Sequence, residues 1–265
     1  MSMQDSKNFR ESKDYIQSLE RGLMVIQAFS ADTPQLTVSQ AAAATSLSRP
    51  AVRRILLTLE ALGFAESANG IYSLTARTLT LGYAYLSSKN VWSLAQPFMR
   101  EFTDKTGESC SVSVLDGNEI VYVARVQAKR IMRINLDVGS RLPAYATSMG
   151  HILLAHQPEV KLEELLKDIP FEGFTSNTIT DREFLKKELG EVKNRGWAGV
   201  DQQLEEGLRS IAVPILVNGK VIAAINCSAH AGRVSKEELR GTYLEMLRET
   251  ARDISSAITA SGQTI

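Results

Sequence analysis

The stretch TVSQAAAATSLSRPAVRRILLTLEALG, residues 37–63, predicts two helices joined by a short turn. Thr37 is a typical helix N-cap, and Gln40 follows at the spacing of a capping box. Ser48 begins the second helix with Pro50 in its first turn, where the missing N–H of proline costs no hydrogen bond. The stretch therefore has the organisation of a helix-turn-helix unit.

The flanking residues extend this unit to a small domain over residues 15–77. Apolar side chains recur at helical spacing before the unit, which predicts a preceding helix. These residues are Ile16, Leu19, Leu23, Ile26 and Phe29. After the unit, Asn69-Gly70 predicts a hairpin between strands at 64–66 and 71–74, which makes this a winged helix-turn-helix domain. Residues 1–14 are polar and of mixed charge, so we expect a flexible arm there.

The second helix of such a pair enters the major groove of DNA, with its N-terminal residues facing the bases. Between Thr33 and Leu59 the chain has three arginines and no acidic residue, so this helix carries a local basic stripe. Arginine can bind a guanine edge through two hydrogen bonds, and serine can bind phosphate or base. The expected DNA-binding residues are Thr37, Ser48, Arg49, Pro50, Arg53 and Arg54. The competing interpretation is a solvated charged face on an ordinary three-helix domain.

Beyond this domain the pattern changes to mixed α/β. Residues 78–94 read as one linker helix, and residues 95–262 combine strands and helices. Turn residues at 116–118 and 218–219 predict two hairpins in that region. We therefore expect an α+β chain in which a linker helix joins a winged helix-turn-helix domain to an α/β domain.

The composition limits the class of protein. Thirty Lys and Arg balance thirty Asp and Glu in 265 residues, which excludes a globally polybasic nucleic-acid binder. Two cysteines, three histidines and the lack of a CxxC pair or a nucleotide-binding glycine motif predict no metal and no cofactor. No apolar run approaches the ~20 residues that cross a bilayer. Because the N-terminus also lacks the apolar region of a secretory signal, we expect a cytoplasmic protein without a membrane partner.

Five segments resemble the IclR family of bacterial transcriptional regulators. They are SLERGLMVIQAF (18–29), residues 37–64, GSRLPAYATSMGHILLA (139–155), GWAGVDQQLEEGLRSIAVPI (196–215) and INCSAHAGRVS (225–235). The later segments are most similar to the subgroup that regulates protocatechuate, p-hydroxybenzoate and β-ketoadipate catabolism. The resemblance implies a regulator rather than an enzyme, and a GAF-like α/β domain that binds a small organic acid from aromatic catabolism.

The resemblance also implies where the acid binds. Ser148 and Met149 match the loop that meets the carboxylate, and a helix opening at residues 147–150 would offer free N–H groups to an anion. The remaining implied residues are the polar Ser210, Asn226 and Ser228 and an apolar wall of Ile134, Leu142 and Leu208. Relatives often carry a small residue at position 149 and Ser at position 226, and these departures bear on effector size. The competing interpretation is that the polar residues are satisfied core side chains.

An alternative function is a small-molecule-binding or hydrolytic α/β protein whose helical N-terminus only dimerises. Ala146-Thr147-Ser148-Met149-Gly150 nearly matches the nucleophile elbow G-x-S-x-G, and Asp201 and His230 follow in the hydrolase order. The elbow, however, needs a long buried strand before its serine. Gly139, Arg141 and Pro143 interrupt that stretch, so hydrolysis is disfavoured.

Assembly follows from the small footprint of one winged-helix unit on DNA. Specific recognition usually needs two units on a palindromic site. The expected partners are double-stranded operator DNA, a small organic acid and a second copy of the chain, in a homodimer or a dimer of dimers. An activator would also contact RNA polymerase. We expect the acid to act through residues 78–94, which join the two domains.

Overall fold

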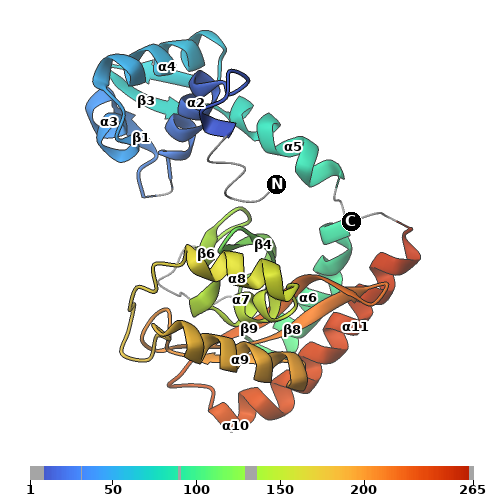
Figure 1. The fold of residues 1–265 in the computed structure, drawn as a ribbon. Coiled ribbons are helices and arrows are strands. Elements are labelled where there is room, and N and C mark those ends of the chain that lie inside the picture. Colours follow the sequence, from blue (N-terminus) through green and yellow to red (C-terminus); the bar gives the residue numbers. More distant parts are fainter. Residues whose placement is uncertain (1–8, 31, 89–90, 129–135, 263–265) are drawn as a thin grey trace. The chain divides into compact units, whose positions relative to one another are not determined.

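The structure is a computed structural model of the 265-residue chain (Figure 1). The residues that it describes are 9–30, 32–88, 91–128 and 136–262. The chain divides into two compact units, residues 1–88 and residues 89–265.

The N-terminal unit is the predicted winged helix-turn-helix domain. Its elements are α2 (Gln17–Gln27), β1 (Gln35–Thr37), α3 (Val38–Thr45), α4 (Arg49–Ala61), β2 (Ala65–Ala68), β3 (Ile71–Leu74), the short turn η1 (Ala76–Thr78) and α5 (Leu79–Ser88). Val25, Val52 and Leu56 are fully buried between the helices. The sequence did not predict β1. This strand pairs with the side of β3 that faces away from β2, in the sheet order β1-β3-β2.

The local signals of the helix-turn-helix are confirmed. Thr37 N donates to Gln40 Oε1 over 2.8 Å, and Gln40 N donates to Thr37 Oγ1 over 3.3 Å, which completes the capping box. Ser48 Oγ accepts the N–H of Ala51 at the start of α4. The hairpin turns at Asn69 and Gly70, whose φ angles of 54° and 79° require the left-handed conformation that these residue types adopt most easily.

The predicted linker helix over residues 78–94 ends earlier in the structure. Helix α5 ends at Ser88, and a second helix, α6 (Val91–Thr106), begins three residues later. Val91 and Trp92 are buried in the core of the C-terminal unit, so residues 91–94 belong to that unit. The sequence pattern continued across this boundary because apolar residues recur on both sides of it.

The C-terminal unit is built on a six-stranded antiparallel sheet in the order β6-β5-β4-β9-β8-β7. The strands are β4 (Ser109–Asp116), β5 (Glu119–Val126), β6 (Arg141–Pro143), β7 (Ala198–Asp201), β8 (Leu208–Val217) and β9 (Lys220–His230). The two predicted hairpins are β4–β5 and β8–β9. Pairing of β4 with β9 joins the hairpins into one sheet.

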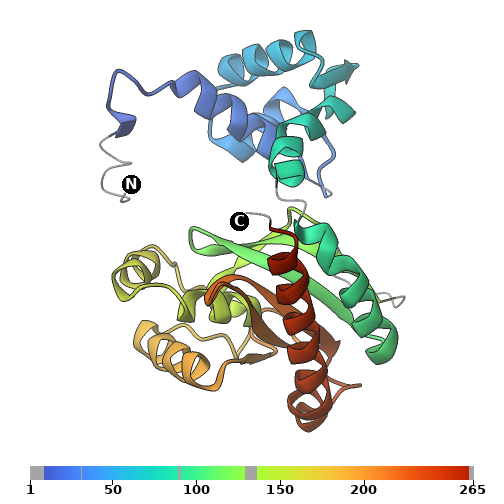
Figure 2. The ribbon, with the colours of Figure 1, turned by 90° about the vertical axis from the view of Figure 1, so that its right-hand side faces the viewer.

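Helices cover both faces of this sheet. The helical elements after α6 are the short turn η2 (Ala144–Ala146), α7 (Ser148–Ala155), α8 (Glu159–Lys167), α9 (Arg182–Arg195), α10 (Lys236–Glu238), η3 (Leu239–Tyr243) and α11 (Leu244–Ala260). Helices α6 and α11 lie side by side on one face (Figure 2), and α7 and α9 pack in the core of the other face. This is the GAF-like arrangement that the sequence predicted.

Gly150 in the first turn of α7 packs directly against the backbone of η2. A Cβ atom at this position would lie 2.0 Å from the carbonyl oxygen of Ala144. Because backbone cannot give way as a flexible side chain does, we expect Gly150→Ala to lower the free energy of unfolding by ~1–3 kcal/mol or more. Urea denaturation of the purified protein measures this change.

Gly190 provides the matched control, because it is an exposed glycine in the interior of α9 with open space around it. Gly190→Ala should leave stability unchanged or raise it by up to ~1 kcal/mol, as helix propensity predicts. Equal stability of the two variants would contradict the close contact at Gly150.

Candidate functional site

The first two turns of α4 present the predicted DNA-binding surface. Ser48, Arg49, Pro50, Arg53 and Arg54 are exposed, whereas Thr37 is half-buried and engaged in the capping box. Among the described residues, no carboxylate pairs with the three arginines. Arg49 and Arg53 are one helical turn apart and share a face. Arg54 points ~100° away from Arg53 around the helix and lines a groove against α2.

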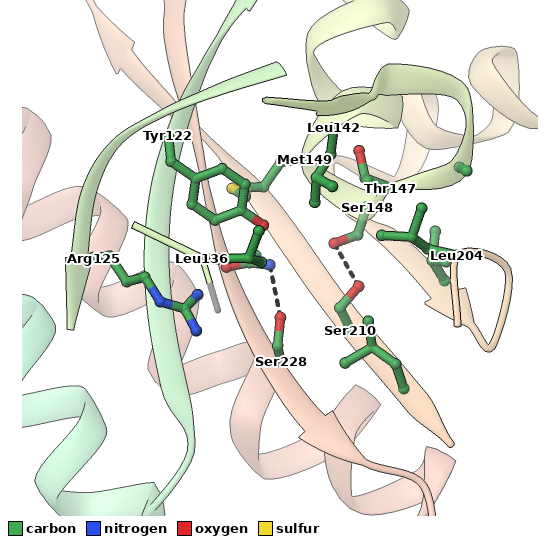
Figure 3. Close-up of a pocket in the computed structure, with 14 residues that line it drawn as sticks. Tyr122, Arg125, Leu136, Leu142, Thr147, Ser148, Met149, Leu204, Ser210 and Ser228 are labelled. Atoms are coloured by element: carbon green, nitrogen blue, oxygen red, sulfur yellow. Dashed lines mark hydrogen bonds between the residues drawn. The ribbon is translucent and has the colours of Figure 1, made fainter. Parts of the chain in front are cut away.

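A pocket lies between the sheet and α7 in the C-terminal unit (Figure 3). Predicted residues from four separate segments line it together. They are Leu142, Ser148, Met149, Leu208, Ser210, Asn226 and Ser228. Ile134 lies outside the described residues. The structure therefore brings together every predicted effector residue that it describes.

One end of the pocket is the start of α7. Thr147 Oγ1 accepts the N–H of Gly150 over 3.1 Å, which caps the helix. The N–H groups of Ser148 and Met149 have no partner within the helix, and they carry the positive end of its dipole. Ser210 Oγ donates to Ser148 Oγ over 2.9 Å, so two hydroxyl groups lie beside these N–H groups. This end can bind a small anion.

The middle of the pocket contains an incompletely satisfied amide. Asn226 is 4% exposed, and its Nδ2 donates to Ser228 Oγ over 2.9 Å. Its Oδ1 is buried and has no hydrogen-bond partner in the described structure. Ser113 Oγ donates to Met149 Sδ over 3.2 Å and holds that side chain in the wall. A buried amide oxygen without a partner favours a ligand or water at this point.

Sequence reasoning missed two prominent residues of the pocket, Tyr122 and Arg125 on β5. Arg125 Nη1 donates to Ser111 Oγ over 3.1 Å, and its guanidinium lies 6.0 Å from the centre of the Tyr122 ring. Burial raises the pKa of Tyr122 to about 12, so the phenol is neutral at physiological pH. The remaining residues missed are Leu136, Ala146, Thr147, Val200 and Leu204. Regular strand alternation would place Tyr122 and Arg125 on opposite faces of β5. The register shift against β4 between Val112 and Ser113, which the sequence does not reveal, lets both line the pocket.

The pocket is narrow in this structure. Its enclosed volume is about 30 Å³, room for a water molecule or two, whereas ligand pockets typically measure ~300–1,000 Å³. The apolar side chains of Leu136, Met149 and Leu204 line this space. A bound acid would therefore displace at least one of these side chains.

The hydrolase alternative fails on geometry. Ser148 Oγ is bonded to Ser210, and Asp201 pairs with Arg209 and Lys236 over 2.9 and 2.7 Å. His230 Nδ1 accepts the N–H of Gly232 over 3.1 Å. In the described structure, no histidine or carboxylate activates Ser148.

No group of three or more His, Cys, Asp or Glu side chains among the described residues is arranged to hold a metal ion. None of the described helices is both long and apolar enough to span a membrane.

A winged helix-turn-helix unit that is followed in the chain by an α/β unit with a pocket defines a DNA-binding transcriptional regulator that responds to a small molecule. Two family profiles match this chain: the IclR helix-turn-helix domain over residues 18–68, and the C-terminal domain of bacterial transcriptional regulators of the IclR type over residues 83–256. The chain therefore belongs to the IclR family of bacterial transcriptional regulators. It is a regulator and not an enzyme.

Similar proteins include regulators from aromatic catabolism. The Pca regulon regulatory protein of Pseudomonas putida is 44% identical over 248 residues, which cover 93% of this chain and 85% of that protein. The p-hydroxybenzoate hydroxylase transcriptional activator of Acinetobacter baylyi is 34% identical over 253 residues, or 93% of each chain. An IclR homologue from Microbacterium hydrocarbonoxydans, solved with 4-hydroxybenzoate, has a TM-score of 0.79 at 26% identity and covers 92% of this chain and 99% of that one.

His151 on α7 predicts a pH dependence of stability. Its ring is fully buried, and Nε2 donates to the carbonyl of Tyr145 over 2.7 Å. Burial lowers the pKa of His151 in the folded protein, whereas in the unfolded chain it lies near ~6.5. The unfolded state therefore binds more protons below that pH, and the free energy of unfolding falls as the pH drops from 7 toward 5.

Urea titrations between pH 7.5 and 5 measure this slope in the wild type and in His151→Gln, which cannot titrate. The slope should be shallower in His151→Gln. His156→Gln is the matched control, because His156 is the half-buried C-cap residue of the same helix and bonds the Ile152 carbonyl. An unchanged slope in His151→Gln would contradict the assignment.

Proposed function

We propose that this protein binds operator DNA through α4 and that a small organic acid in the pocket of the C-terminal unit controls the transcription of genes for aromatic-acid degradation. The single observation that carries this proposal is the pocket itself. Predicted polar residues from separate segments converge beside an unpaired helix N-terminus, which suits a carboxylate. The relatives named for the Pca regulon and p-hydroxybenzoate hydroxylase support the pathway.

The carboxylate of the acid is assigned to the N–H groups of Ser148 and Met149, with the hydroxyl groups of Ser148 and Ser210 beside it. The protein acts in the cytoplasm as a homodimer or a dimer of dimers, because one winged-helix unit contacts few base pairs. If it is an activator, it also contacts RNA polymerase. The acid changes operator affinity through its preference for one of two conformations, a coupling of ~1–3 kcal/mol.

Arginines 49 and 53 are assigned to the bases or phosphates of the operator. Arg49→Ala and Arg53→Ala should each weaken binding to the DNA beside the gene ~5- to 150-fold, because a lost arginine contact costs ~1–3 kcal/mol. Fluorescence anisotropy across a salt series measures the affinity and its salt dependence. Arg100→Ala removes an exposed charge from α6 and should leave operator affinity unchanged.

Retention of wild-type operator affinity in the double variant Arg49→Ala/Arg53→Ala would contradict this assignment. The basic stripe would then be a solvated face. Circular dichroism of the variants confirms that the exposed substitutions leave α4 folded.

Isothermal titration with p-hydroxybenzoate, protocatechuate and β-ketoadipate tests the effector class. We expect at least one acid to bind and to change operator affinity or the footprint on DNA. Ser148→Ala removes a hydroxyl group from the carboxylate end and should weaken binding of that acid ~10- to 150-fold, because a hydrogen bond to a charged group contributes ~1.5–3 kcal/mol. Equal affinity of the acid for free and operator-bound protein would contradict control through DNA affinity.

A further inference from the structure

Arg125 is a half-buried cation that has no anionic partner among the residues that the structure describes. Its Nη1 bonds Ser111 Oγ, and its Nε is buried with no hydrogen-bond partner among the described residues. No carboxylate of the described chain pairs with it. The neighbouring segment 129–135, which lies outside the described residues, has the sequence KRIMRIN and contains no acidic residue.

The other arginines that are buried or half-buried in the described part of the C-terminal unit all have a carboxylate partner. The pairs are Arg182–Glu163, Arg195–Glu188, Arg209–Asp201 and Arg248–Glu245. Removing a charge from water is unfavourable unless a counter-charge compensates it. Arg125 is thus the exception in this set, and it faces the pocket.

The strand register places Arg125 at the opposite end of the pocket from α7. Arg125 on β5 and Asn226 on β9 both lie directly opposite Ser111 on β4, and Ser228 on β9 lies opposite Ser210 on β8. These residues form a polar row that runs across the sheet from β5 to β8. It crosses three strand spacings, so the backbones of β5 and β8 are ~14 Å apart. Figure 3 shows Arg125 on one side of the cavity and the Ser148–Ser210 pair on the other.

The free donors of Arg125 match a carboxylate. Nη1 is bonded to Ser111, and the Nε–H and Nη2–H edge makes no hydrogen bond to any other residue that the structure describes. Parallel hydrogen bonds from one guanidinium edge are the usual bidentate arrangement for carboxylates. A hydroxyl group could accept from one of these donors, but it would leave the charge of Arg125 unpaired. The site therefore favours a second carboxylate over a hydroxyl group at this end.

We propose that Arg125 is a second anion anchor and that the effector is a dicarboxylate, with one carboxylate at the start of α7 and the other on Arg125. Asn226 and Ser228 contact the part of the molecule between them. The length of the polar row fits two carboxylates separated by a single ring or a short carbon chain. This proposal rests on the acid-binding function proposed above and narrows its ligand class.

Matched pairs of acids test the proposal by isothermal titration at fixed pH. Adipate is compared with hexanoate, and terephthalate with benzoate and 4-hydroxybenzoate. The wild type should bind at least one dicarboxylate ≥10-fold more tightly than its monocarboxylate partner, as a charge-assisted pair worth ~1.5–3 kcal/mol implies. Arg125→Met should remove this preference and change monocarboxylate affinity less than ~3-fold. Arg125→Lys should keep part of the preference, because it keeps the charge but loses the bidentate edge.

Arg100→Met is the matched control, since it removes an exposed arginine of α6 away from the pocket, and it should bind all the acids as the wild type does. Operator binding and circular dichroism establish that the Arg125 variants are folded. The two-anchor proposal would be overturned if Arg125→Met lost affinity equally for mono- and dicarboxylates. It would also be overturned if the wild type preferred 4-hydroxybenzoate to terephthalate and hexanoate to adipate. The proposed function survives these results, whereas failure of every acid to bind the wild type would overturn both proposals.

Discussion

The pocket of the C-terminal unit depends on one close contact, in which the first turn of α7 passes over the backbone of η2. With hydrogen at Gly150 in place of a side chain, this turn lies against the carbonyl of Ala144, and the helix start points into the pocket. Backbone N–H groups rather than a charged side chain therefore form that end. The opposite end is set by strand pairing, because Arg125 and Asn226 both lie opposite Ser111 across β4. A helix contact and a strand register thus fix the two ends independently.

Much of the architecture was predictable because its determinants are local in sequence. The capping box at Thr37, the cap at Ser48 and the turn at Asn69-Gly70 act within a few residues, and a hydrogen bond or a backbone angle in the structure confirms each of them. The hairpin turns of the C-terminal unit are local in the same sense. Local signals do not show that strands and loops far apart in the chain meet in one pocket. The resemblance to a family supplied that information.

The features that sequence reasoning missed depend on distant contacts. Strand β1 has three residues and exists through its pairing with β3. The end of the linker was misplaced because Val91 and Trp92 continue a helical pattern, and only the core that they enter shows which unit they belong to. Arg125 lies in β5, and from sequence alone an arginine in a strand is expected to face solvent. Its position in the pocket follows from the β4–β5 register, in which a bulge shifts the pairing between Val112 and Ser113.

The narrowness of the pocket affects the ligand concentration at which the regulator responds. In most ligand-free molecules the protein's own side chains fill the pocket. The apparent affinity for a ligand is then the affinity of the open form multiplied by the fraction of molecules that are open. The apolar side chains that close the cavity, Met149 among them, therefore help to set a detection threshold. A low concentration of the compound would leave the pocket unoccupied, and a high concentration would fill it. Packing density in the empty state would in this way tune sensitivity separately from the polar groups that choose the ligand.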